Sequence, residues 1–214
     1  MFNSIEEIKK SYKIKREDIK RRLEDFKKVM DEDDRRVFAE MAFCICTPQS
    51  KATSAWTAIE AVAKNNYLFV GSEKTIRPFL NAVRFADNKT RFIVEARNKF
   101  TEGGQWRLKE KILSFKNPPE ARKWLSDNIM GLGMKEASHF LRNIGMGEDL
   151  AILDVHILDN LKNIGVIDEI PKCLTEKNYL DIEKKLRDFS KLVDIPMEEL
   201  DLLMWSEEAG MIFK

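Results

Sequence analysis

Apolar residues recur every three or four positions along most of this chain, which is the spacing of amphipathic helices. The spacing is clearest from Thr90 to Phe100, from Thr175 to Val193 and from Pro196 to Ala209. The few glycines and prolines fall between such segments, where they can form short joins. No stretch alternates apolar and polar residues strongly enough to predict a sheet. The pattern therefore predicts an all-α protein.

Three helices are expected in the N-terminal part of the chain. Asn3 or Ser4 can cap the first helix. The second is strongly basic and carries an apolar stripe of Ile19, Leu23, Phe26 and Val29. The third, from Arg35 to Cys46, is apolar at nearly every position and is expected to be buried at the centre of one lobe. Pro48 disfavours helix in the residue before it, so this helix should end there and leave Gln49 in the break.

Residues 128 to 145 predict two helices joined by a tight turn. Gly131 and Gly133 flank the apolar Leu132, which suits a hairpin where larger side chains would clash. The buried face of the second helix would carry Ala137, Phe140, Leu141 and Ile144. Free N–H groups at the start of that helix, together with its dipole, favour an anion such as a DNA phosphate. We therefore expect Gly131, Leu132, Gly133 and Met134 to contact DNA.

Lys135 lies at the start of that second helix, where the dipole disfavours a cation, so its amine is expected to have a function. A lysine amine attacks an electrophilic carbon only when it is neutral. Asp154 follows after one helix and one glycine-containing loop, so the chain can bring its carboxylate back to receive or relay a proton. The alternative is a lysine that binds phosphate and an aspartate that only caps the next helix. We favour the activated lysine.

Charge is spread unevenly over the 214 residues, although the net charge is only +1. Between Arg84 and Lys123 there are eleven lysines and arginines but five acidic residues, whereas the last quarter of the chain is acidic. A local basic surface suits phosphate binding, although the same residues could form an ordinary solvated surface. No apolar run approaches the ~20 residues that cross a bilayer, and the first residues lack the apolar core of a signal peptide.

Cysteines and histidines give no indication of a metal site. Cys44 and Cys46 lie two apart in an apolar helical run, so they would point to different sides of the helix and are expected to be buried. With Cys173 as the third cysteine, no disulfide framework is implied, and a reducing cytoplasm is the expected compartment. His139 and His156 could titrate near neutral pH and are expected to be structural or to contact phosphate. We expect no metal and no cofactor.

Three segments resemble the helix-hairpin-helix-GPD superfamily of DNA glycosylases: Gly131–Lys135, the glycine-containing loop Gly145–Asp149, and Leu153–His156. The loop departs from the superfamily pattern because it has no proline. The segments similar to the archaeal-type 8-oxoguanine DNA glycosylase/AP lyases of that superfamily are Phe43–Ser50, Val83–Phe85, Trp205 and Lys214. The chain lacks the four-cysteine cluster that endonuclease III-like relatives use for an iron–sulfur centre, which argues against that branch.

The resemblance implies a bifunctional DNA repair enzyme with two helical lobes and a cleft between them. The terminal lobe would comprise residues 1–30 and 136–214, and the central lobe would comprise residues 31–135, ending in the hairpin. A flipped 8-oxoguanine would enter the cleft, and Lys135 would attack C1′ of its sugar. Asp154 would assist deprotonation of the lysine and stabilise positive charge on the sugar. A Schiff base and β-elimination would then cut the strand without a redox cofactor.

The resemblance also implies how the damaged base is read. Lys214 would help to distinguish 8-oxoguanine, whose N7 carries a hydrogen, from guanine, whose N7 does not. Trp205, and less strongly Phe85, would stack on the flipped base, and Gln49 would fill the gap that the base leaves. For each residue the alternative is a structural role, namely a frayed chain end, core packing or helix capping.

The expected partner is double-stranded DNA that contains 8-oxoguanine, bound by a monomer in the cytoplasm, at the nucleoid, with no membrane involved. Two rival functions stay open. A glycosylase of the same superfamily could act on another damaged base, or a non-catalytic protein could use the hairpin only to bind DNA phosphates. A covalent adduct between a lysine and damaged DNA would exclude the second rival.

Overall fold

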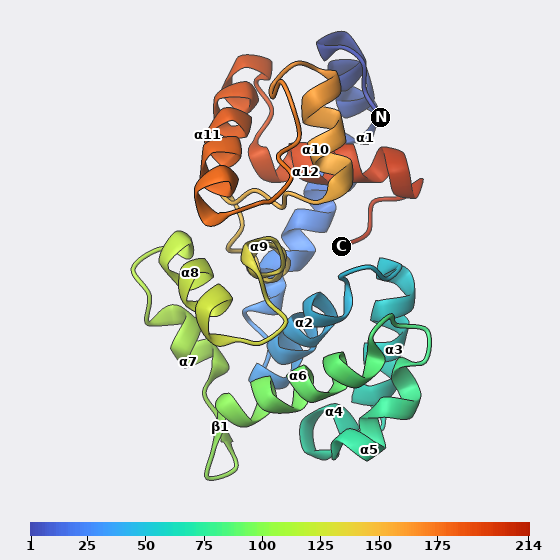
Figure 1. The fold of residues 1–214 in the computed structure, drawn as a ribbon, viewed down its shortest axis with the longest axis vertical. Helices are drawn as coiled ribbons and strands as arrows, with labels where there is room; N and C mark the ends of the chain where they lie inside the picture. Colours follow the sequence, from blue (N-terminus) through green and yellow to red (C-terminus); the bar gives the residue numbers. More distant parts are fainter.

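Helices form most of the chain, as the apolar spacing predicted, and the computed structural model describes all 214 residues (Figure 1). A small antiparallel sheet pairs β1 (Thr101–Glu102) with β2 (Gln105–Trp106). None of the helices combines the length and the apolar character that a membrane span requires. The helices are α1 (Ile5–Val29), α2 (Asp34–Cys46), α3 (Ala52–Lys64), α4 (Tyr67–Val70), α5 (Glu73–Ile76), the 3₁₀ helix η1 (Arg77–Leu80), α6 (Ala86–Lys99), α7 (Leu108–Leu113), α8 (Pro118–Asn128), α9 (Met134–Asn143), α10 (Val155–Asn163), α11 (Glu176–Val193) and α12 (Met197–Ala209).

Helix α1 is continuous, so the prediction of two helices in this segment was wrong. Its 25 residues contain neither glycine nor proline, and nothing in them forces a break. Ser4 caps the helix, because its hydroxyl accepts a hydrogen bond from the Glu7 N–H at 3.2 Å. Ile8, Ile19 and Phe26 are all buried, and their spacing places them on one face of a single long helix.

The small sheet was not predicted either. Its strands are joined by Gly103 and Gly104, whose φ angles are 56° and 81°. Positive φ at two successive residues makes a tight hairpin turn, which glycine permits at little cost. Strands of two residues are too short to show the alternation from which a sheet is predicted.

Helix α2 is the buried helix that its apolar composition predicted. Every residue from Val37 to Cys46 is buried, and α3, α6, α7 and α9 pack against the helix (Figure 1). Asp33 caps the start of α2 by accepting a hydrogen bond from the Arg36 N–H at 2.9 Å. The helix ends at Cys46, directly before Thr47 and Pro48. Thr47 itself keeps helical backbone angles, with φ −69° and ψ −34°, so Pro48 ends the helix because it has no N–H to donate.

Two apolar cores stabilise the molecule, and α9 lies between the corresponding layers in Figure 1. The central core draws its buried residues from Val29–Leu150, and the terminal core draws them from Phe2–Phe26 and Ala151–Met204. Helix α1 therefore contributes to both cores. The apolar face of α9 belongs to the central core, so the packing boundary falls after Leu150. The division of the chain into domains at residues 30 and 135 stays a prediction.

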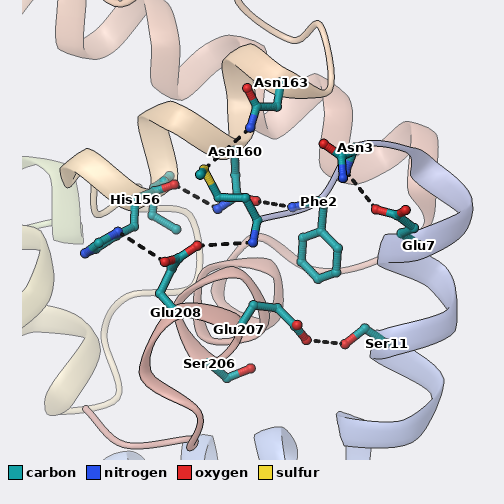
Figure 2. A network of polar contacts seen from close by, with 12 residues as sticks. Phe2, Asn3, Glu7, Ser11, His156, Asn160, Asn163, Ser206, Glu207 and Glu208 are labelled. Carbon is teal, nitrogen blue, oxygen red and sulfur yellow. Dashed lines mark hydrogen bonds and ion pairs between the residues drawn. The ribbon is translucent and has the colours of Figure 1, made fainter.

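Hydrogen bonds tie the N-terminal residues to α10 and α12 (Figure 2). The Phe2 N–H donates to Asn160 Oδ1 at 2.8 Å, and the Asn160 side chain donates to the His156 carbonyl at 2.8 Å. The His156 ring nitrogen Nδ1 lies 3.8 Å from a carboxylate oxygen of Glu208 on α12. Because Phe2 is also buried in the terminal core, these contacts fix the first turns of α10 against both ends of the chain.

The hairpin between α8 and α9 depends on a glycine at residue 131. Gly131 has a φ of 88°, a conformation that residues with a side chain rarely adopt. A Cβ atom there would lie 2.8 Å from Phe92 Cδ2 and 3.3 Å from Ile45 Cγ2, both in the central core. Glycine at this position therefore satisfies the backbone and the packing at the same time.

We predict that Gly131→Ala lowers the free energy of unfolding by about 1 to 3 kcal/mol, because it adds both backbone strain and a clash with Phe92. Chemical denaturation of the purified protein measures this loss. The matched control is Gly103→Ala, which shares a positive φ of 56° but would meet no atom within 4 Å. Equal losses in the two variants would contradict the role assigned to the clash.

Candidate active site

One cleft of about 1000 Å³ lies between the two cores and is lined by residues of both. Its walls come from the turn between α2 and α3, from α9, from the segment that enters α10, from α12 and from the last residues of the chain. The residues of the sequence prediction that line this cleft are Gln49, Lys135, Asp154, Trp205 and Lys214. Five residues separated by up to 165 positions are thus brought to one cavity by the fold.

Lys135 lies in the first turn of α9, and its side chain is only 21% exposed. Its Nζ is 3.7 Å from Glu136 Oε1, while Glu136 Oε2 accepts a hydrogen bond from the Gly133 N–H at 3.3 Å. The Glu136 carboxylate therefore interacts with the hairpin backbone and with the lysine together. This acidic residue offsets the unfavourable effect of the helix dipole on a cation at this position. The sequence analysis did not single out Glu136.

Asp154 caps α10, since its Oδ1 accepts a hydrogen bond from the Ile157 N–H at 2.9 Å. The capping role that the sequence offered as an alternative is therefore present. A carboxylate has a second oxygen, so capping does not exclude a chemical role for the same side chain. Asp154 and Lys135 line the same cleft, although a helix and a loop separate them in the sequence.

Asp201 of α12 is a third carboxyl group in this cleft, and the sequence analysis missed it. Burial raises the pKa of Asp201 to about 6, and the negative charge of Asp154 adds to this rise. The positive charges of Arg142 and Lys135 oppose the rise. The carboxyl group is 3.2 Å from Arg142 Nη1. Lys135, Asp154 and Asp201 all line this cleft, so one amine and two carboxyl groups share the same cavity. Asp201 gave no signal in the sequence because it is one of five acidic residues in α12, and nothing local distinguishes it from the others.

Lys214 is only 5% exposed, which confirms the prediction that the chain end is docked on the protein. Its ammonium forms an ion pair with Glu40 of α2 and lies 3.5 Å from the ring centroid of Trp56. Glu40 is fully buried, forms a second ion pair with Arg36, whose Nη2 lies 2.7 Å away, and accepts a hydrogen bond from Asn143 Nδ2 at 3.0 Å. Burial lowers the pKa of Lys214 to about 8, and the charge of Glu40 opposes this shift.

The two aromatic residues proposed to stack on a base lie in different places. Trp205 lines the cleft and stacks on Phe213, with ring centroids 6.5 Å apart and an interplanar angle of 29°. Phe85 does not line the cleft. Its side chain is 53% exposed, and its ring packs beside the Arg84 guanidinium.

Gln49 lies at the rim of the cleft, in the turn after α2, with a φ of 55°. Lys89 of α6 stabilises this turn, because its ammonium donates to the carbonyls of Cys46 and Pro48 at 2.8 and 2.6 Å. The same ammonium lies 3.2 Å from the Ser50 hydroxyl. A buried lysine therefore holds the backbone on both sides of Gln49, a role that the sequence did not reveal.

His139 was expected to be able to titrate near neutral pH, and this was wrong. The ring is fully buried on α9, and burial together with the nearby cations Arg142, Lys135 and Lys214 holds its pKa well below the ordinary value. It packs edge to face against Phe43 at 5.5 Å, which is the structural role that was also expected. Cys44 and Cys46 are buried as predicted. No group of three histidine, cysteine or acidic side chains is arranged to hold a metal ion.

The glycine turn of the hairpin lines a second hollow of about 630 Å³, away from the first cleft. Gly131, Leu132 and Gly133 contribute to it, and Lys99 donates to the Asn128 carbonyl at 2.8 Å beside them. The Leu132 side chain is buried in the central core, so only its backbone faces this hollow. Met134 packs against the terminal core instead.

The fold and the site define a class: an all-helical protein of two cores, with a hairpin lysine and a capping aspartate at the cleft between them. The chain belongs to the 8-oxoguanine DNA glycosylase family, whose family model matches residues 19–195.

Curated relatives of the chain carry the name 8-oxoguanine DNA glycosylase/AP lyase. The protein of Fusobacterium nucleatum is 47% identical over 214 residues, which is 100% of this chain and 97% of that protein. The protein of Methanocaldococcus jannaschii is 37% identical over 215 residues, which is 100% of this chain and 99% of that protein.

Solved structures show the same fold. The crystal structure of the M. jannaschii 8-oxoguanine DNA glycosylase has a TM-score of 0.86 at 33% identity, over 98% of this chain and 95% of that one. The same archaeal enzyme in complex with a 15mer DNA containing 8-oxoguanine has a TM-score of 0.85 at 34% identity, over 97% and 99% of the two chains. The 8-oxoguanine DNA glycosylase of Thermotoga maritima has a TM-score of 0.85 at 31% identity, over 98% of each chain.

The buried pair of Lys214 and Glu40 leads to a titration prediction. We expect the Lys214 amine to titrate near pH 8 in the folded protein, and at a lower pH in Glu40→Gln, because the Glu40 charge raises this pKa. NMR of protein labelled with ¹³C-lysine follows the titration. The matched control is Glu199→Gln, which removes another buried glutamate that pairs with Tyr12 instead. A Lys214 midpoint that stays at the ordinary lysine value of 10.5 would contradict the burial of its ammonium.

Proposed function

We propose that this protein excises 8-oxoguanine from double-stranded DNA and then cleaves the strand, with Lys135 as the nucleophile and Asp154 as its partner. The observation that carries the proposal is the arrival of both side chains at one cleft from two successive helices. The family match and the relatives named 8-oxoguanine DNA glycosylase/AP lyase support the reaction and the lesion. The related archaeal structure that contains 8-oxoguanine DNA supports DNA as the substrate.

The chemistry begins with a neutral amine on Lys135. The amine forms a bond to C1′ of the deoxyribose while the bond from C1′ to the base breaks, and the base leaves with that electron pair and is protonated. Asp154 takes up the proton that the attacking nitrogen loses, and its charge favours the cationic character that develops on the sugar. The bond from C1′ to the ring oxygen O4′ then breaks as O4′ takes the proton back from Asp154, and the nitrogen lone pair forms the C=N bond of a protonated Schiff base on Lys135. Loss of a proton from C2′ breaks the bond between C3′ and its oxygen, which cuts the strand by β-elimination.

Recognition of the base falls to other residues that line the same cleft. 8-Oxoguanine differs from guanine by a carbonyl at C8 and a hydrogen on N7, so a site that pairs with these groups discriminates against guanine. We assign this discrimination to Lys214 and the stacking face to Trp205, both of which line the cleft. Gln49, on the strained turn at the rim, would enter the gap left in the duplex. The proposal gives Phe85 no contact with the flipped base, because its half-exposed side chain lies outside the cleft.

The hairpin turn would bind the phosphate backbone on the surface beside the cleft. A helix N-terminus favours a phosphate, and the buried Leu132 side chain leaves only backbone groups of the turn for that contact. Because these contacts carry no sequence information, they would position the duplex rather than select the lesion.

Borohydride trapping tests the nucleophile. We predict a covalent adduct between the protein and duplex DNA containing 8-oxoguanine, and none with Lys135→Gln, because an amide nitrogen cannot form a Schiff base. The matched control is Lys51→Gln, which removes another lysine of the same cleft and should leave trapping intact.

The same experiment separates the rival functions. An adduct with thymine-glycol DNA and none with 8-oxoguanine DNA would favour a glycosylase for another damaged base. Binding that weakens with salt, with no adduct on any lesion, would favour a non-catalytic DNA-binding protein. Equal trapping by the wild-type protein and Lys135→Gln would show that a different amine is the nucleophile.

Removal of the Lys214 ammonium tests base discrimination. We predict that Lys214→Met, combined with Glu40→Gln so that the buried carboxylate is not left without its lysine, reduces the preference for 8-oxoguanine over guanine by about 10-fold or more. Single-turnover excision from matched duplexes measures this preference, and Glu40→Gln alone is the control. Schiff-base trapping on an abasic duplex should persist, since Lys135 is unchanged. Loss of that trapping would contradict the separation of base reading from sugar chemistry.

A further inference from the structure

A buried polar cluster lies outside the cleft, between α8, α9 and α11. Its members are Arg122, Ser138, Tyr179 and Glu183, and none is more than 4% exposed. Ionic and hydroxyl groups are costly to bury unless each finds a partner, so such a cluster requires a reason for its place in a core. The mechanism described above uses none of the four.

Three hydrogen bonds from this cluster reach the segment directly before Asp154. The Ala151 N–H donates to Glu183 Oε2 at 2.8 Å, and the Tyr179 hydroxyl donates to the Ala151 carbonyl at 2.6 Å. The Leu153 N–H donates to the Tyr179 oxygen at 3.3 Å. This buried segment belongs to no helix or sheet, so its backbone groups depend on side chains for their partners.

The same cluster also reaches the lysine helix. Arg122 forms a two-pronged ion pair with Glu183, in which Nη2 lies 3.0 Å from Oε1 and Nη1 contacts Oε2. Arg122 Nη1 also lies 3.3 Å from the hydroxyl of Ser138, and the Tyr179 hydroxyl lies 3.4 Å from it. Ser138 follows Lys135 by one helical turn on α9. One connected set of bonds therefore links the helix of the lysine to the segment of the aspartate.

We propose that Tyr179 and Glu183 are positioning residues that set the separation of Asp154 from Lys135. This rests on the proposed roles of those two side chains. A buried ion pair is weak evidence for stability, because apolar residues of the same shape often stabilise a core as well or better. The directional bonds of this cluster fix the position of residues 151–153 relative to α9, which apolar contacts alone would not do. No backbone ladder holds this segment, because it belongs to no helix or sheet.

The test is Tyr179→Phe, which removes the hydroxyl but keeps the ring and its packing. We expect the single-turnover rate of 8-oxoguanine excision to fall by about 10- to 100-fold, because displacement of a catalytic group by about 1 Å has an effect of that size. The dissociation constant for the damaged duplex should stay within about 2-fold, since the cluster does not line the cleft. A slower chemical step with unchanged binding is a result that general destabilisation does not produce.

The matched control is Tyr12→Phe. Tyr12 also donates its hydroxyl to a glutamate, Glu199, at 2.6 Å, and it packs against the same terminal core, but it does not contact residues 151–153. Loss of this partly buried hydroxyl should lower thermal stability, though less than loss of the buried Tyr179 hydroxyl, and should leave the excision rate unchanged. If Tyr12→Phe slows excision as much as Tyr179→Phe, the effect is a general loss of stability and the proposal is wrong.

A double-mutant cycle with Asp154→Asn identifies the route of the effect. If Tyr179 acts by placing Asp154, then Tyr179→Phe should slow excision far less in the Asp154→Asn background than in the wild-type background. Equal slowing in both backgrounds would overturn the proposal. Glu183→Gln gives a second reading, since glutamine keeps an acceptor for the Ala151 N–H while weakening the pair with Arg122, and its excision rate should fall between those of the wild-type protein and Tyr179→Phe.

Failure of the proposed function would look different. If the wild-type protein forms no trapped adduct, or if Asp154→Asn excises at the wild-type rate, the assigned catalytic pair is wrong. If Asp154→Asn is slow and Tyr179→Phe excises at the wild-type rate, the catalytic pair stands and only the positioning role is overturned.

Discussion

Helix α9 packs one face into the central apolar core and turns the other toward the cleft, and the position of the cleft follows from this constraint. Its apolar side chains, Ala137, Phe140 and Leu141 among them, belong to the central core. Its other face lines the cleft with Lys135, His139 and Arg142, which are four and three residues apart. Because this spacing returns to one side of a helix, a core packed on the apolar face forces all three polar groups into the space between the lobes.

The charges that this arrangement buries are held in pairs. Arg142 of α9 pairs with Asp201 of α12, and Lys214 at the chain end pairs with Glu40 of α2. An unpaired ion at such depth would be very costly, so each cation needs its partner in the opposite element. The neutral His139 lies among these cations, and their combined charge keeps its pKa low. The cleft thus contains fixed charges before any substrate enters, which is the condition under which electrostatic stabilisation of a reaction is strongest.

Backbone strain occurs in the turn that lines the cleft at Gln49 and in a neighbouring turn outside the cleft at Phe85, as well as at Asn66 and Asp194 elsewhere in the chain. Gln49 and Phe85 both have positive φ angles, 55° and 58°, although neither is glycine. Their two turns are joined, because the Arg84 N–H donates to the Ser50 hydroxyl at 2.9 Å and Lys89 binds the carbonyls around Gln49. Strain of this kind persists only where the surroundings hold it, and here the side chains of Lys89 and Ser50 hold both turns.

The sequence by itself determined the helical class, the buried α2, the glycine hairpin and the positions of Lys135 and Asp154 on their helices. These features are local, since spacing, capping and the limits on proline and glycine act over a few residues. The tertiary structure alone decided that Phe85 lies outside the cleft and that the partners of the buried ions are Glu40 and Asp201. The ion pairs depend on side chains more than 50 residues apart meeting in a low-dielectric interior, and no local pattern encodes such a meeting.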